Sequence, residues 1–122
     1  MLGSERTNSA SNNPVPRAEA IARLNDKLRT TRCGGHIMVT RGVSTLDGFS
    51  AAELIARLRD YEGFDIDNDP HGERDFGDLI LCGEDLLWKI DAYDTSMKSG
   101  SPDPADERVT TRVMTVMLAS EY

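Results

Sequence analysis

Side chains that could do chemistry are most concentrated between Phe64 and Asp78, in the stretch FDIDNDPHGERDFGD. The stretch holds one His, one Arg and six carboxylates, which are Asp65, Asp67, Asp69, Glu73, Asp75 and Asp78. Carboxylates at this density are typical of a divalent-metal site, a carboxylate-based active site, a surface that imitates nucleic acid, or a solvated loop. The residue types alone leave these four interpretations open.

The spacing of the first three aspartates is that of the first ligands in an EF-hand calcium loop. Asp65, Asp67 and Asp69 fall on ligand positions one, three and five of such a loop. Position six requires Gly and position twelve a bidentate Glu, but the chain has Pro70 and Phe76 there. We therefore expect no EF-hand. An irregular Mg²⁺ or Ca²⁺ site stays open, because hard cations accept any converging oxygens.

His71 could act as a general base, because the unperturbed pKa of His lies near neutrality. No Ser or Cys nucleophile is tied to it by sequence. Since the chain has one other His, His36, a zinc site has little support. We expect His71 to be a solvated loop residue, and we predict no catalytic residue, no bound metal and no cofactor.

The same stretch is also rich in turn formers, namely Asn68, Asp69, Pro70 and Gly72. A solvated loop therefore explains part of its composition. Like charges repel one another, however, and a loop alone does not need so many. We predict that the six carboxylates form a binding surface for a partner that neutralises them.

The charge of the whole chain narrows the class of partner. The 122 residues carry a formal net charge of −7. Direct binding of DNA or RNA needs a basic face for the phosphates, so we expect no nucleic-acid partner. An acidic protein suits a basic protein surface, such as that of a nucleic-acid-binding effector.

Composition also bounds the location and the domain organisation. No apolar run follows Met1, and no stretch approaches the roughly 20 apolar residues that span a bilayer. We expect a cytoplasmic protein with no signal peptide and no membrane partner. Residues 1–13 read as a disordered tail and residues 14–122 as a single domain. Cys33 and Cys82 lack metal-ligand and secreted-disulfide spacing, and we expect both to be small buried residues.

Three local patterns predict the elements of the first half. Apolar residues at helical spacing predict a helix that begins near Pro16 and ends near Gly34–Gly35; they are Ala18, Ile21, Leu24 and Leu28. The β-branched run at 36–43 predicts a strand. Ser50 and Glu53 form a capping box, which predicts a second helix that stops before Gly63.

The second half begins with a predicted hairpin. Two β-rich runs, DLILC and DLLWKIDAY, flank Gly83-Glu84, and Gly followed by a polar residue is a hairpin signal. The second run alternates, which places Trp88 on the core face and Lys89, Asp91 and Tyr93 on the opposite face.

The C-terminal segment is predicted to be a third helix. Asp103 would cap it and Pro104 would occupy its first turn. Its buried stripe would be Val109, Val113, Val116 and Met117, and Trp88 should pack against that stripe. The order is then helix, strand, helix, strand, strand, helix. We expect an α+β fold in which helices pack on one face of a small antiparallel sheet.

Long segments of the chain resemble an uncharacterised family of small alphaproteobacterial proteins, known as a domain of unknown function. The segments are LNDKLR, GGHIMVTRGV, DNDPHGERDFGD, WKIDAYD and GSPDPADERVTTRVMTVMLASEY, and the resemblance runs from Arg17 to Tyr122. It implies carriage on plasmids and integrated elements, near antirestriction-type genes. It attaches no reaction, ligand or catalytic residue to any position.

Three functional hypotheses follow. The first is an interaction protein, an anti-CRISPR or antirestriction inhibitor whose six carboxylates bind a basic groove of a nuclease or effector complex. The second is a phosphoesterase that uses a divalent cation held by carboxylates of the same stretch. The third is a regulatory accessory protein of a mobile element. Binding of a divalent cation separates the second hypothesis from the first.

Overall fold

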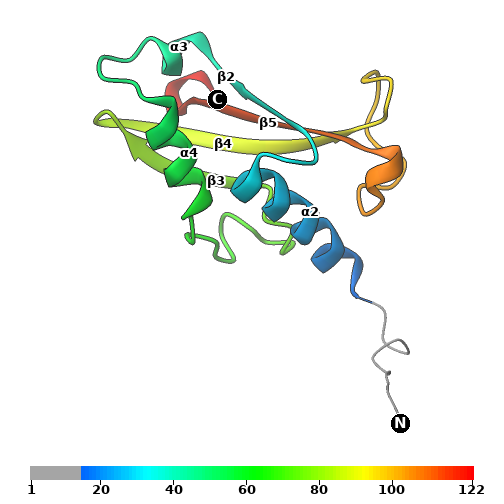
Figure 1. Ribbon diagram of the computed structural model, residues 1–122. Helices are drawn as coiled ribbons and strands as arrows, with labels where there is room; N and C mark the ends of the chain where they lie inside the picture. Colours follow the sequence, from blue (N-terminus) through cyan, green and yellow to red (C-terminus); the bar gives the residue numbers. More distant parts are fainter. Residues whose placement is uncertain (1–14) are drawn as a thin grey trace.

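A computed structural model describes residues 15–122, and the expected disordered tail at 1–13 lies outside the described residues. The elements in chain order are α2 (Arg17–Thr31), β2 (His36–Val39), α3 (Arg41–Ser44), α4 (Ala51–Arg59), β3 (Phe76–Leu81), β4 (Glu84–Tyr93), the 3-10 turn η1 (Glu107–Val109), β5 (Thr111–Leu118) and the 3-10 turn η2 (Ala119–Glu121). The predicted α+β class is confirmed. Figure 1 shows α2 and α4 together on one face of the sheet.

The sheet is mixed, whereas an antiparallel sheet was expected. Its four strands lie in the order β2-β5-β4-β3. The pairs β3–β4 and β4–β5 are antiparallel, but β2 pairs with β5 in parallel. The expected sheet had no strand in the place of β5, so a parallel partner for β2 was not predicted.

The prediction of a C-terminal helix is wrong, because residues 111–118 form β5 at the centre of the sheet. A central strand is covered on both faces, and Val113, Met114, Val116 and Met117 of β5 are all buried. Such a strand reads as a continuous apolar run, which periodicity alone does not distinguish from a buried helix. Trp88 is buried as predicted, but it lies opposite Val116 of a strand.

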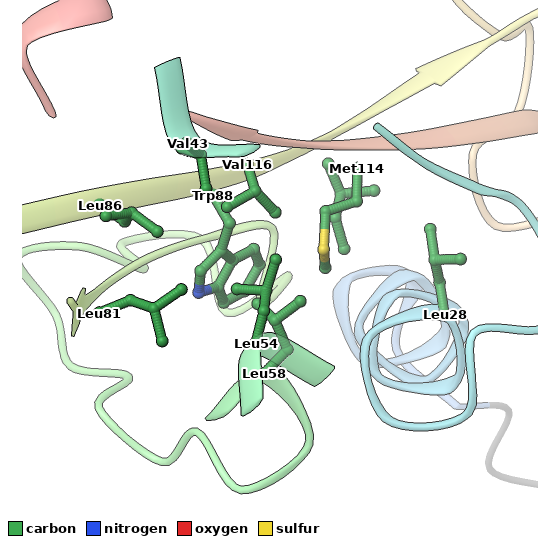
Figure 2. Close-up of a cluster of buried hydrophobic side chains, with 10 residues drawn as sticks. Leu28, Val43, Leu54, Leu58, Leu81, Leu86, Trp88, Met114 and Val116 are labelled. Atoms are coloured by element: carbon green, nitrogen blue, oxygen red, sulfur yellow. The ribbon is translucent and has the colours of Figure 1, made fainter. Parts of the chain in front are cut away.

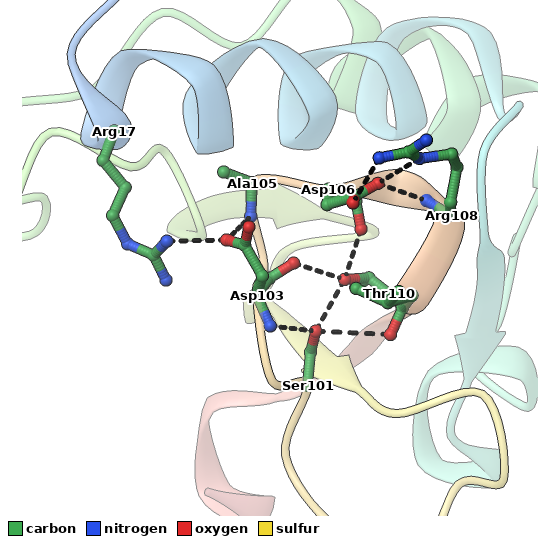
Figure 3. A network of polar contacts seen from close by, with 8 residues as sticks. Arg17, Ser101, Asp103, Ala105, Asp106, Arg108 and Thr110 are labelled. Atoms are coloured by element: carbon green, nitrogen blue, oxygen red, sulfur yellow. Dashed lines mark hydrogen bonds and ion pairs between the residues drawn. The ribbon is translucent and has the colours of Figure 1, made fainter.

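The loop before β5 explains why the capping signal at Asp103 does not start a helix. The Asp103 carboxylate accepts a hydrogen bond from the Ala105 amide at 3.1 Å and so closes only a short turn. The Ser101 and Thr110 hydroxyls lie 2.6 Å apart, and Thr110 Oγ1 is also 2.8 Å from the Asp106 carbonyl oxygen. These contacts draw the two ends of the loop together (Figure 3). The chain therefore enters β5 directly after the single turn η1.

The first helix and the first strand are shorter than expected. Helix α2 ends at Thr31, and Arg32, not a glycine, takes the left-handed conformation with a φ of 65°. Strand β2 ends at Val39, because Thr40 caps the short helix α3 and its hydroxyl accepts a hydrogen bond from the Val43 amide.

The hairpin and the Ser50 cap of α4 are confirmed, but the Glu53 carboxylate accepts a hydrogen bond from Arg57 at 3.4 Å and does not complete the predicted capping box. The Ser50 hydroxyl accepts a hydrogen bond from the Glu53 amide at 3.2 Å, at the start of α4. Between β3 and β4 the turn residues are Cys82 and Gly83, with φ of 54° and 74°, one position earlier than the predicted Gly83-Glu84, because Glu84 already pairs with Leu81. Two positive φ values in succession are typical of the tight hairpin turn that matches strand twist.

Cys82 and Cys33 are both exposed, so the expectation that they are buried is wrong.

Trp88 lies at the centre of the core. Its side chain is 0% exposed and is surrounded by aliphatic side chains from the sheet and from α3 and α4 (Figure 2). Gly77 lies directly opposite Trp88 in the β3–β4 register. A Cβ at Gly77 would lie 2.6 Å from three indole atoms, so the ring rests on the bare backbone of β3.

Within residues 15–122, no helix has the length and the apolar composition that a membrane span requires.

Candidate functional site

The segment between α4 and β3, residues 60–75, carries most of the predicted site and is here called the acidic loop. Its fold is fixed by its own side chains. Asp65 Oδ1 accepts hydrogen bonds from the amides of Asp67 at 2.9 Å and Asn68 at 3.0 Å. Asp69 Oδ1 accepts a hydrogen bond from the Arg74 amide at 2.9 Å. Two of the predicted binding carboxylates therefore build the loop, in the way expected of Asp in turns.

An aromatic cluster anchors the acidic loop to the core. The ring of Phe64 meets Tyr61 edge to face at a centroid distance of 4.9 Å and Trp88 at 5.9 Å. The guanidinium groups of Arg29 and Arg74 lie 5.3 Å and 5.0 Å from the Phe64 centroid. Both contacts fall within the range of a cation–π interaction, so the loop is held at its base by apolar and electrostatic contacts together.

A buried polar chain joins the far end of the loop to α2 and β5. Asn25, on α2, donates a hydrogen bond to the Glu73 carbonyl oxygen at 2.9 Å. The Asn25 side-chain oxygen accepts a hydrogen bond from Arg112 Nε at 2.8 Å, and Arg112 also donates to the Pro104 carbonyl oxygen. Asn25 and Arg112 are 3% and 2% exposed. Burial lowers the pKa of the Arg112 guanidinium, because it penalises the charged form.

The six predicted carboxylates do not form one compact group. Five of them lie on the acidic loop, and Asp78 lies on β3, where Tyr61 Oη is 3.4 Å from its carboxylate. The exposed members are Asp65, Asp67 and Asp78, and the half-buried ones are Asp69, Glu73 and Asp75. Within residues 15–122, none of the six forms an ion pair. Their charge is therefore not neutralised by close contacts in the described part of the chain.

The geometry gives no support to a metal-dependent reaction at this loop. No group of three or more His, Cys, Asp or Glu side chains converges on a common point anywhere in the described residues. Burial raises the pKa of the Asp75 carboxyl, because it penalises the charged form. His71, the candidate base, is exposed.

Sequence reasoning missed Ile66, which lies between Asp65 and Asp67. Its side chain is 81% exposed, the highest value among the exposed large apolar side chains. The sequence did contain a signal for this exposure. Ile66 stands alone among carboxylates and has no apolar neighbour three or four positions away inside the loop.

Sequence reasoning also missed a hollow where α2, the end of α4 and the acidic loop meet. We call it the arginine hollow, and its lining residues are Arg29, Arg59, Tyr61, Glu62, Phe64 and Arg74. Its arginines come from three separate elements, so no local sequence pattern could have indicated it.

One comparison with known proteins identifies a family. Residues 39–121 match the family model described as Protein of unknown function (DUF3768). No curated protein and no solved structure matches the chain.

Proposed function

We propose a function from the premise that the chain belongs to the DUF3768 family, whose model covers more than half of its 122 residues. The protein is a small acidic interaction protein that binds a basic protein surface through the acidic loop. The contact is made by an apolar anchor with carboxylates at its sides, and it needs neither a metal nor a cofactor.

The observation that carries the proposal is the exposure of Ile66. Burying an Ile side chain is worth about 1.5–3 kcal/mol, and this side chain is 81% exposed in the chain alone. Single buried anchors of this kind contribute much of the energy of protein interfaces. The flanking Asp65 and Asp67 are exposed and would meet Lys or Arg side chains around the socket that receives Ile66.

The rigidity of the loop supports the same proposal. Asn68 donates a hydrogen bond to the Gly63 carbonyl oxygen at 2.8 Å, and the Asp69 amide donates one to the Asp65 carbonyl oxygen at 2.8 Å. The tip with Ile66 is therefore held by contacts at both of its ends. A preorganised loop loses little conformational entropy on binding, which leaves more of the contact energy as affinity.

The setting implied by the resemblance narrows the partner. The resemblance implies carriage on plasmids and integrated elements, where small acidic proteins often protect the element from host defence. We propose that the basic partner is a CRISPR effector or a restriction nuclease, whose groove for nucleic acid is positively charged. A net charge of −7 favours encounter with such a groove.

The test compares two double variants at different places on the protein. The first removes one negative charge from the acidic loop, and the control removes two negative charges elsewhere. Ile66→Ser/Asp67→Asn changes the tip of the acidic loop, where both side chains are exposed and neither donates or accepts a side-chain hydrogen bond with another described residue. Glu84→Gln/Asp85→Asn changes the exposed start of β4 instead. Inhibition of DNA cleavage is measured across a panel of CRISPR effectors and restriction nucleases.

We expect the parent and the Glu84/Asp85 variant to inhibit the same effector, and the Ile66/Asp67 variant to lose about tenfold or more in potency. The difference should grow at low ionic strength, because screening of exposed charges weakens there. Equal potency of both variants would place the contact outside the acidic loop. No inhibition of any effector by the parent would remove the anti-defence assignment. No observation on the described residues favours the phosphoesterase or the regulatory alternative.

A further inference from the structure

We propose that the arginine hollow is a binding site for a small phosphate-type oxyanion. The inference does not rest on the proposed function, because Ile66 and Asp67 do not line the hollow. It rests on the charges of three arginines, on the burial of Arg29 and on the positioning of Arg29 and Arg74.

The first step is the local charge balance around two of the lining arginines, Arg29 and Arg74. Asp26 is shared by two arginines: its Oδ1 lies 2.9 Å from Arg29 Nη2 and its Oδ2 lies 3.2 Å from Arg74 Nη1. Two guanidinium groups thus share one carboxylate. Arg29 is only 4% exposed, and its buried Nε has no hydrogen-bond partner among the described residues. A buried charge is costly unless it is compensated, and an anion in the hollow would add a second negative charge beside the two guanidinium groups that share Asp26.

The second step is that these arginines are held in place before any ligand binds. Arg29 Nη1 donates a hydrogen bond to the Leu58 carbonyl oxygen at 2.7 Å, at the C-terminal end of α4. The Arg74 guanidinium lies over the Phe64 ring, whose edge contacts fix its own position. Fixed guanidinium groups bind oxyanions with less loss of side-chain entropy than free ones.

The third step is that the rim offers one displaceable cation. The Arg59 side chain is 54% exposed, and its ion-pair partner Asp60 is 69% exposed. Exposed pairs of this kind are worth little, so an anion in the hollow could take Arg59 from Asp60. Glu62 also lines the rim, and its charge opposes an anion.

Phosphate fits this arrangement better than a monoanion does. Guanidinium groups bind phosphate and carboxylate through paired N–H donors, and a dianion gains more from several cations than a monocarboxylate gains. The ligand class is therefore a phosphate or phosphate monoester, with inorganic phosphate as the probe.

The experiment is a titration of the full chain with sodium phosphate at constant ionic strength, followed by backbone amide chemical shifts in solution NMR. We expect saturable shifts confined to the end of α4, the acidic loop and the second half of α2. Sodium acetate at the same ionic strength should bind several-fold more weakly. Tighter binding of acetate than of phosphate would overturn the ligand class.

Three single variants test the site itself. Arg59→Gln should weaken phosphate binding about three- to tenfold, and Glu62→Gln should strengthen it, because one removes an attractive charge and the other a repulsive one. Arg41→Gln, an exposed position on α3 with the same charge change as Arg59→Gln, is the matched control and should bind like the parent. Shifts that do not saturate, or equal losses in the Arg59 and Arg41 variants, would overturn the proposal.

Discussion

Replacing Gly77 by Ala tests whether the core is built around a Trp ring lying on bare backbone. The φ of Gly77 is not positive, so Ala is compatible with the backbone and the effect is one of space. The new Cβ would lie 2.6 Å from Cε2, Cζ2 and Nε1 of Trp88. An ordinary contact needs about 1 Å more, so a fully buried ring has to move in a close-packed core.

The magnitude follows from two opposing effects. Overpacking of this kind costs about 1–3 kcal/mol, and the upper part of the range applies because three atoms of a fully buried ring would lie only 2.6 Å from the new Cβ. Ala lowers the conformational entropy of the unfolded chain relative to Gly, which returns about 0.4–1 kcal/mol. We expect a net loss of about 2 kcal/mol in the free energy of unfolding. This corresponds to a fall of roughly 8 °C in melting temperature for a domain of this size.

The assay is thermal and urea denaturation of Gly77→Ala beside Gly100→Ala. A Cβ added at Gly100 would point into open space, with no heavy atom beyond the adjacent residues within 4 Å, and the φ of Gly100 is not positive. Its substitution therefore controls for the loss of a glycine alone. The control should be more stable than the parent by about 0.4–1 kcal/mol, because it carries the same gain from the unfolded chain and no overpacking. If both variants unfolded alike, the close approach of Trp88 to β3 would be refuted.

Three further outcomes are expected. Trp88→Ala should lower the free energy of unfolding by about 3–5 kcal/mol in urea denaturation, through the cavity it leaves. Asn25→Ala should cost about 1–3 kcal/mol, because it removes the partner of the buried Arg112 Nε and of the Glu73 carbonyl oxygen. Faster amide exchange in the acidic loop should accompany that loss, and unchanged exchange would contradict the link. Asp75→Asn should stabilise the protein at pH 7, since burial raises the pKa of the Asp75 carboxyl in the folded state. Above about pH 3.9, the unfolded-state pKa of Asp, the folded parent binds more protons than the unfolded chain. The parent therefore loses stability as pH rises from the unfolded-state pKa to the folded-state pKa of Asp75. Below that window the carboxyl is protonated in both states, and the gain in the variant should vanish.

The parts of the fold that the sequence predicted are those with local causes. Ser50 caps α4 through an amide three residues away, and the alternation around Trp88 follows from one strand and one turn. The strand β5 was missed because its pairing is entirely non-local: it lies between β2 and β4, and its burial on both faces removes the alternation by which a strand is recognised.

The candidate site divides in the same way. The sequence located the acidic loop, because composition is local. It could not show that the carboxylates of Asp65 and Asp69 bind backbone amides within that loop. An aspartate that stabilises a turn and an aspartate that faces a partner are the same residue type in the sequence. The arginine hollow depends on Arg29 and Arg74 meeting at Asp26, a contact that exists only once α2 and the loop are packed together.

The central place of β5 has a consequence for synthesis of the protein. Every other strand of the described chain leaves the ribosome before β5, yet β2 has no neighbour in the sheet except β5. Until β5 emerges, the nascent chain can form at most the hairpin of β3 and β4, with the indole of Trp88 uncovered on the side of the missing strand. An isolated two-stranded hairpin is at best marginally stable in water. The sheet is therefore expected to assemble after translation of β5 has finished, and the unfinished chain is the state most exposed to aggregation and to chaperones.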